Sequence, residues 1–364
     1  MSKTTKTILW FVVVIIIIII AGIWYGVSRK PIAPTIKEPI KIGVIAPLTG
    51  GGAAFGKSLV AAIEIAKEQL SKTKYSYEII VEDDESNPTK AANAAQKLIN
   101  VDKVRALITT TSGTGNAVAP LAELAKVPHI CVCSDDAVSR GRRYSFNNLV
   151  FPEDEAKVLV SELKKRNLGK VAIISMQHPG INKIVDEIIK EANSMGVKIV
   201  FEERFIKGTT DFKTIFLKAK SKNPDIYVIQ SFPPELEMLG QTYQELGIKE
   251  PLTTNAAFAI TAKPELFEGF WYIDASLKDE KFKKEFVEKY PEIRFNPRSA
   301  PYGYDSFNIL VRAFENNKEN PLEYLDNLKE YYGKVGKLVK IENRFKSEAQ
   351  VWVIKNGNST PINY

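Results

Sequence analysis

The strongest constraint on the fold is a regular alternation of apolar strand patterns and amphipathic helix patterns that begins at residue 40. Strands are expected at 40–46, 76–83, 104–110 and 128–134, with helices between them at 54–70, 89–101 and 117–125. Strands that are apolar throughout, and that alternate with helices, are typical of a parallel sheet covered on both faces. The sequence therefore predicts an α/β fold.

The same alternation starts again after residues 151–152, which indicates a second unit. Helices are expected at 153–166, 182–195, 212–221 and 235–246, and strands at 170–176, 197–205, 225–232 and 251–255. Roughly 325 residues exceed the usual size of one domain, so two lobes are expected. Ligands of such sheets bind at the carboxyl ends of the strands, where candidate site residues should be sought.

Residues 8–27 form a run of twenty residues without a charge, followed by Arg29 and Lys30. A helix of that length spans about 30 Å, the thickness of the hydrocarbon core of a bilayer. Two interpretations are open, an uncleaved transmembrane anchor and a cleaved signal sequence. We favour the anchor, because the run exceeds the apolar region of about 7–15 residues found in signal sequences. Trp24 and Tyr25 at its end also suit a membrane interface.

The segments around this run set the expected topology. A short basic segment such as residues 1–7 usually stays in the cytoplasm, which places the rest of the chain outside. Residues 28–39 are expected to form a linker, made semi-rigid by three prolines. The sequence thus predicts a single-pass protein of the cell membrane with an extracytoplasmic part, in the periplasm or at the cell exterior.

Charge and composition exclude several function classes. The net charge is +7, and the first 30 residues supply four of the cations, which leaves +3 for the rest. That excess is too small to indicate nucleic-acid binding. Cys131 and Cys133 would share one face of a strand, and we expect buried free thiols there. Two cysteines and two histidines are too few for a metal site, and no cofactor is expected.

The sequence also lacks the motifs of enzymes. It contains no nucleophile-elbow pattern, no phosphate-binding loop and no metal-binding cluster of residues. The expectation is therefore that the chain is not an enzyme.

Seven segments in a fixed order resemble the branched-chain amino-acid (Leu/Ile/Val) type of periplasmic binding protein, which has the type I fold and serves ABC transporters as the substrate-binding protein. They are IKIGVIAPLTGGGAAFGKSLVAAIEIA, VEDDESNPTKAANAAQKLI, ALITTTSGTGNAVAPLAELAKVPHI, GTTDFKTIFLKAKSKNPDIYVIQSF, APYGYDSFNILVRAF, YYGKVGKLVKIENRF and VWVIKNG. The resemblance covers about residues 40–357. It implies two lobes, each a parallel sheet flanked by helices, that close on a small ligand like a hinged trap.

The resemblance also implies three crossovers between the lobes, near 149–152, 272–276 and 332–336. Lobe I would then comprise residues 40–150 plus 277–333. Lobe II would comprise residues 151–274 plus 336–360.

Three residues of lobe I resemble the element that holds the ligand carboxylate in amino-acid-binding relatives. Ser112, Gly113 and Thr114 follow a strand and precede a helix, where backbone N–H groups and hydroxyls attract anions. The alternative is that Thr114 or Asn116 only caps the helix.

The next candidate loop contains Asp135, Asp136 and Ala137, where relatives carry small or hydroxylated residues. Two carboxylates would repel a ligand carboxylate and would favour an ammonium group or sugar hydroxyls. The alternative is that both side chains point to solvent or cap the next turn.

Four further candidates come from the resemblance. Phe55 and Phe232 would form aromatic walls of the cleft, although either could belong to the core. His178 stands where relatives have Tyr–Gly, and could instead be a surface residue. Near Asn255 relatives place a carboxylate that pairs with the ligand ammonium, and this chain has none there. Because an unpaired ammonium is costly to desolvate, an aliphatic amino acid is not assured as ligand, although Asp136 could replace the missing carboxylate.

The function implied is capture of a small ligand, an amino acid or a related compound, by hinge closure and its delivery to an ABC importer. The expected partners are this ligand, an ABC permease and the membrane, which the N-terminal helix contacts. One alternative is a membrane-anchored sensor or scavenger without a permease. Another is a two-lobed α/β enzyme such as a sugar-nucleotide transferase, against which the fixed order of the segments argues.

Overall fold

The computed structural model describes residues 3–27 and 38–362, which belong to two separate units, 1–39 and 40–364. The first unit contains the helix α1 (Lys3–Val27), as expected for the apolar run. Its residues 3–21 are long and apolar enough to cross a membrane, and signal sequences share these properties. The linker expected at 28–39 lies, up to residue 37, outside the described residues, as do the side chains of Trp24 and Tyr25.

Lobe I of the second unit is built on an eight-stranded sheet. Its strands are β1 (Ile40–Ala46), β2 (Tyr77–Asp83), β3 (Ala106–Thr110), β4 (His129–Val132), β5 (Ser145–Asn148), β11 (Glu330–Gly333), β12 (Gly336–Ile341) and β13 (Arg344–Lys346). Their order is β11-β12-β13-β5-β4-β3-β1-β2. The strands β1 to β5 and β13 pair in parallel, and β11 and β12 extend the sheet as an antiparallel hairpin.

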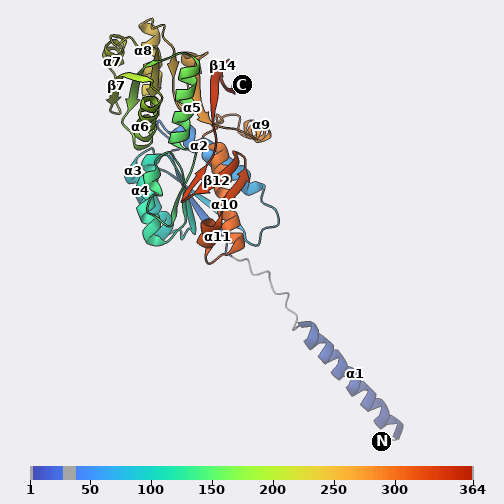
Figure 1. Ribbon diagram of the computed structural model, residues 1–364. Helices are drawn as coiled ribbons and strands as arrows, with labels where there is room; N and C mark the ends of the chain where they lie inside the picture. The colour runs from blue at the N-terminus through green and yellow to red at the C-terminus, as the bar shows by residue number, and fades with distance from the viewer. Residues whose placement is uncertain (1–2, 28–37, 363–364) are drawn as a thin grey trace. The chain divides into compact units, whose positions relative to one another are not determined.

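Helices cover both faces of this sheet, as the apolar strands predict (Figure 1). The helices of lobe I are α2 (Ala53–Glu68), α3 (Pro88–Asn100), α4 (Ser112–Ala125), α9 (Glu280–Lys289), α10 (Ala300–Asn316) and α11 (Pro321–Asn327), of which α9 packs on α2. Ile42 and Val44 of β1 pack in one apolar cluster with α2 and α10, whereas Ile45 packs with α3 and α4. Alternate residues of a strand point to opposite faces, so this strand is buried on both sides.

Lobe II contains two smaller sheets. The four-stranded parallel sheet consists of β6 (Lys170–Met176), β7 (Lys198–Phe205), β8 (Ile226–Gln230) and β9 (Leu252–Thr253), in the order β7-β6-β8-β9. The antiparallel sheet consists of β10 (Trp271–Ala275), β14 (Ala349–Lys355) and β15 (Asn358–Pro361). A single bridge between Asn255 and Ile273 joins the two. Their helices are α5 (Pro152–Lys165), α6 (Pro179–Ser194), α7 (Phe212–Lys220) and α8 (Glu235–Glu245).

The chain passes between the lobes after β5, after β10 and after β13. The third crossover therefore lies at residues 347–348, and its expected position at 332–336 is wrong. Residues 336–346, expected in lobe II, form β12 and β13 of the lobe I sheet.

The physical reason is that residues 333–336 form a tight hairpin turn instead of a hinge. Gly333 pairs with Gly336, whose φ of +94° suits a turn and is open to glycine without strain. The buried Asp305 carboxylate accepts hydrogen bonds from the backbone N–H groups of Lys334 and Val335, at 2.8 and 3.1 Å.

Candidate functional site

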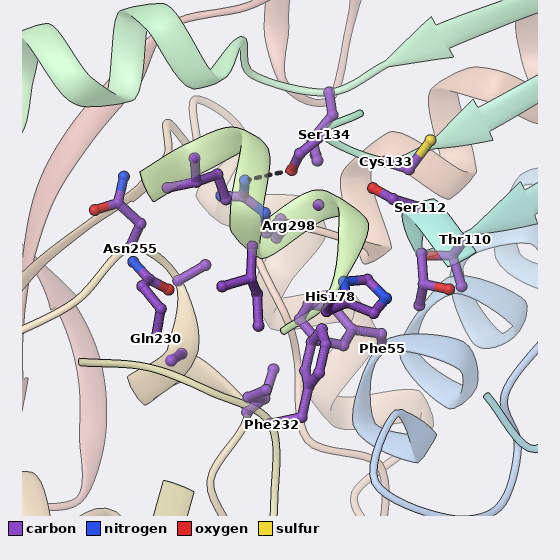
Figure 2. Close-up of a pocket in the computed structure, with 18 of the residues that line it drawn as sticks. Phe55, Thr110, Ser112, Cys133, Ser134, His178, Gln230, Phe232, Asn255 and Arg298 are labelled. Carbon is purple, nitrogen blue, oxygen red and sulfur yellow. Dashed lines mark hydrogen bonds between the residues drawn. The ribbon is translucent and has the colours of Figure 1, made fainter. Parts of the chain in front are cut away.

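A cavity lies between the two lobes, with about 580 Å³ of space that no protein atom fills, including the part open to solvent. Lobe I contributes Phe55, Thr110, Thr111, Ser112, Val132, Cys133, Ser134, Leu149 and Arg298. Lobe II contributes His178, Gly180, Ile181, Ile184, Gln230, Ser231, Phe232, Asn255, Ala256, Ala257 and Ile260. A ligand in this cavity would contact both lobes (Figure 2).

The lobes touch each other directly at two glycines, of which Gly180 lines this cavity. A Cβ atom on Gly180 of lobe II would lie 2.6 Å from Ser112 Oγ of lobe I. A Cβ atom on Gly51 of lobe I would lie 2.4 Å from the backbone oxygen of Pro233. Both distances are far below ordinary contact, so a larger residue at either position would force its neighbour to move. The structure therefore shows a closed arrangement of the lobes.

The helix α4 starts at Ser112, five residues earlier than the sequence indicates, because Thr111 is its N-cap. The Thr111 hydroxyl accepts from the N–H of Thr114, so the alternative that Thr114 or Asn116 caps the helix is wrong. Thr111 has φ +68°, which is unusual for a β-branched residue and costs about 1–3 kcal/mol. Strain of this kind gathers at functional sites. It turns the first turn of α4 toward the cleft, where Thr111 and Ser112 line the cavity.

The other two residues of this expected group do not line the cavity. Gly113 and Thr114 line a neighbouring hollow that opens between Gly51, Pro88 and the His178 loop. Thr114 is buried and its hydroxyl donates to the buried carboxylate of Asp84. The role of Thr114 in this structure is therefore to fix α4 to the end of β2.

Two serine hydroxyls of the cavity have a protein donor, which leaves their own protons free. Ser112 Oγ accepts from the N–H of Asp135 at 3.1 Å. Ser134 Oγ accepts from the Arg298 guanidinium at 3.1 Å (Figure 2). By contrast, the hydroxyls of Thr110 and Ser231 donate to backbone oxygens of the protein.

The acidic loop does not line the cavity, so the expectation for Asp135, Asp136 and Ala137 differs from what the structure shows. Asp135 caps a short turn by accepting from the N–H of Ala137, and also accepts from Asn116. Asp136 pairs with Arg140 at 2.6 Å and lies 3.9 Å from Lys183. Burial alone would raise the pKa of Asp136, but these cations outweigh it and hold the pKa below its usual range. Asp135 thus follows the capping alternative that the sequence left open, whereas Asp136 is held by cations.

Three aromatic rings form one wall that joins the lobes. Phe232 meets Phe55 edge-on with ring centroids 6.0 Å apart, and meets His178 with centroids 5.0 Å apart. Burial lowers the pKa of His178 to about 4, against a smaller opposing effect of Asp135. His178 is therefore neutral near pH 7, and it lines the cavity instead of lying on an outer surface.

Asn255 and Gln230 form a neutral amide pair at the lobe II side. With its amide oriented to suit both partners, Gln230 donates to the Asn255 backbone oxygen at 3.0 Å and accepts from the Asn255 N–H at 2.6 Å. The side-chain amide of Asn255 has neither of its polar atoms hydrogen-bonded, although the residue is only 2% exposed. Position 255 thus carries a buried neutral amide.

Arg298 is a site residue that the sequence analysis missed. It precedes α10 in lobe I, and its buried guanidinium holds both oxygens of Glu155 and lies 3.3 Å from Asp274, both of lobe II. Burial raises the pKa of Asp274 to about 6, although Arg298 opposes this. Nothing in the local sequence separates Arg298 from the many exposed arginines and lysines, because its partners lie more than twenty positions away.

The expected free thiols are also corrected, since a disulfide joins Cys131 and Cys133. The prediction that both share one face was sound, and it is this shared face that allows the bond. Gly115 of α4 packs against both sulfur atoms, so the pair supports the wall behind Ser112. Within residues 3–27 and 38–362, no group of three His, Cys, Asp or Glu side chains is placed to hold a metal ion.

The family model described as periplasmic binding protein matches residues 39–336. The Leu/Ile/Val-binding protein homolog 7 of Brucella suis is 25% identical over 62% of this chain and 60% of its own length. The Leu/Ile/Val-binding protein BraC3 of Rhizobium johnstonii is 26% identical over 61% and 62%. The match thus spans about three fifths of these relatives.

Solved structures show the same fold over nearly their whole length. A leucine-binding protein LivK of Thermotoga maritima has a TM-score of 0.81 at 24% identity, covering 89% of this chain and 98% of that one. A solute-binding protein of an ABC transporter from R. palustris, in complex with benzoate, has a TM-score of 0.80 at 18% identity, covering 89% and 96%.

Proposed function

Because the chain belongs to the periplasmic binding protein family, as the sequence resemblance indicated, we propose that it is the solute-binding protein of an ABC importer. It captures a small organic ligand between its lobes and delivers it to a permease. This is a family of binding proteins, and membership confirms the expectation that the chain is not an enzyme.

The observation that carries the proposal is the cavity whose walls come from both lobes. A ligand that contacts both walls stabilises the closed arrangement more than the open one, and this difference drives hinge closure. The two glycines where the lobes touch allow them to meet around the ligand.

The cavity favours a ligand with an apolar body and an acceptor group. Phe55, Phe232 and three isoleucines supply apolar wall, and Ser112 and Ser134 supply free O–H donors. Relatives named as Leu/Ile/Val-binding and a structural neighbour with benzoate support an amino acid or an aromatic acid.

The place of action we propose is the extracytoplasmic side of a membrane, with α1 as an uncleaved anchor. Support comes from the length of the helix and from the family. Intact-mass measurement on the protein from the membrane fraction tests the anchor. A mature chain that begins after residue 27 would show a signal sequence instead.

A thermal-unfolding screen of the full chain in mild detergent tests binding. The panel contains amino acids, aromatic acids, sugars and polyamines. A ligand at a hundredfold excess over its dissociation constant adds about 2.7 kcal/mol of stability and raises the midpoint. The double variant Ser112→Ala and Phe232→Ala should lose that shift. A panel in which no class raises the midpoint would overturn the proposed function.

A further inference from the structure

We propose that the ligand is a carboxylate without an ammonium group, such as a 2-oxo, 2-hydroxy or aromatic acid, and that Asn255 sets this preference. The inference rests on the proposed function and names its ligand class.

No carboxylate lines the cavity in the described part of the chain. Glu155 and Asp274, the two acidic side chains beside the cavity residue Arg298, are both bound to it. Asp136, which could have replaced the missing carboxylate, is paired with Arg140 and lies outside the cavity lining. An ammonium group in this cavity would lose its hydration without gaining a counter-charge, which is costly.

The lobe I wall of the cavity is rich in hydrogen-bond donors. The hydroxyl protons of Ser112 and Ser134 are free, because both oxygens already accept from the protein. The first turn of α4 adds N–H groups and the positive end of the helix dipole. Donors and partial positive charge on one wall match a carboxylate.

The lobe II wall of the cavity is neutral. His178 is uncharged near pH 7, and Gln230 is held by the Asn255 backbone. Asn255 has a buried amide whose donor and acceptor are both unused by the protein. A neutral wall tolerates a hydroxyl, an oxo group or a bare ring, and it offers an ammonium no charge.

Isothermal titration calorimetry on the full chain in mild detergent tests this with compounds of one carbon skeleton. The probes are L-leucine, 4-methyl-2-oxopentanoate, 2-hydroxy-4-methylpentanoate, 4-methylpentanoate and its neutral amide, with benzoate as the aromatic acid. We expect the oxo, hydroxy or aromatic acid to bind at least about tenfold more tightly than leucine. The reason is that burying one polar group without a partner, here the ammonium of leucine, weakens binding by about this factor. We also expect 4-methylpentanoate to bind at least about tenfold more tightly than its amide, because the amide lacks the charge that the donors match.

The variant Asn255→Asp adds the carboxylate that the cavity lacks. It should tighten leucine binding by about tenfold and weaken the binding of the oxo acid by a similar factor, since the new charge attracts one and repels the other. Asn193→Asp is the matched control. Asn193 is exposed on α6, so this substitution adds the same negative charge away from the cavity. It should leave both affinities unchanged.

Each outcome has a defined meaning. If leucine binds as tightly as the oxo, hydroxy and aromatic acids, the ligand class is wrong and the proposed function stands. If the amide matches the acid, or if only a sugar or polyamine from the wider panel binds, the carboxylate is wrong and the proposed function again stands. If no compound of either panel binds, both proposals fall. Because the ligand comparison uses the natural chain, a poorly folded Asn255→Asp variant would not decide it.

Discussion

Gly180 at the start of α6 lies so close to Ser112 at the start of α4 that a Cβ atom on the glycine would stand 2.6 Å from the serine hydroxyl oxygen. The two residues belong to different lobes, so this contact exists only while the lobes are closed. Ser112 also lines the cavity. Ser112 therefore takes part both in the contact between the closed lobes and in the wall that faces the ligand.

Gly180→Ala should oppose closure without unfolding either lobe. Overpacking costs about 1–3 kcal/mol, and a cost confined to the closed state raises the dissociation constant by about 5–150-fold. Calorimetry with the natural ligand class measures the constant. The control is Gly169→Ala, whose new Cβ atom would meet nothing nearer than 3.9 Å. Equal affinities in the two variants would contradict the closed arrangement as the binding state.

Phe232→Ala should weaken ligand binding more than it weakens the fold. The ring packs against Phe55 of the other lobe and against His178, so its loss opens one wall of the cavity. We expect the dissociation constant to rise by about tenfold, as for a central aromatic contact of an interface. Tyr332→Ala, at a side chain 66% exposed, removes a ring of similar size and should change nothing. An unchanged affinity in Phe232→Ala would place the ligand elsewhere.

Arg298→Met should destabilise the protein by about 3–5 kcal/mol, because it leaves the buried carboxylates of Glu155 and Asp274 without their cation. Chemical denaturation measures the free energy of unfolding. Arg140→Met removes an arginine whose side chain is 66% exposed, and its pair with Asp136 should be worth no more than about 1 kcal/mol. Similar losses in the two variants would mean that the buried cluster adds nothing beyond a surface pair.

His129→Gln should flatten the loss of stability in acid. His129 is fully buried, and burial together with the charge of Arg142 lowers its pKa to about 3, from about 6.5 in an unfolded chain. Between these values the unfolded chain binds a proton that the folded chain does not, so stability is complete above about pH 6.5 and falls as the pH is lowered.

The contribution of His129 amounts to about 1.4 kcal/mol for each pH unit in that window. Denaturation of both proteins at pH 7.5 and pH 4.5 gives the difference in slope. Because other groups titrate in the same range, only the difference between natural protein and variant is assigned to His129. Identical losses in both would show that His129 becomes protonated in the folded state.

Much of the architecture could be predicted because its signals are local. The apolar residues at six of the seven positions of β1 and the periodic patterns after it indicated parallel strands with helical connections. The third crossover could not be found this way. Residues 330–346 contain strands that suit either lobe, and only their pairing with β5 places them in lobe I.

The candidate site divides in the same manner. Phe55, Ser112, His178, Phe232 and Asn255 were chosen from the family resemblance, in loops expected at strand ends, and the structure brings them to one cavity. Asp135 and Asp136 also follow a strand end, but their carboxylates are already engaged. Asp135 accepts hydrogen bonds from Ala137 and Asn116, and Asp136 forms an ion pair with Arg140. A polar side chain near a strand end can line the cavity, or it can cap a turn or pair with a neighbouring cation. Its position along the chain does not show which of these it does.

The sequence by itself determined the order of strands and helices, the apolar N-terminal segment and the family, because each follows from the spacing and identity of neighbouring residues. The tertiary structure alone decided which polar groups remain available to a ligand. That choice depends on contacts between distant residues, as when Arg298 takes up Glu155 and Asp274 and leaves the cavity without a carboxylate. The charge of the cleft depends on all the charged groups around it, and these groups come together only in the folded protein.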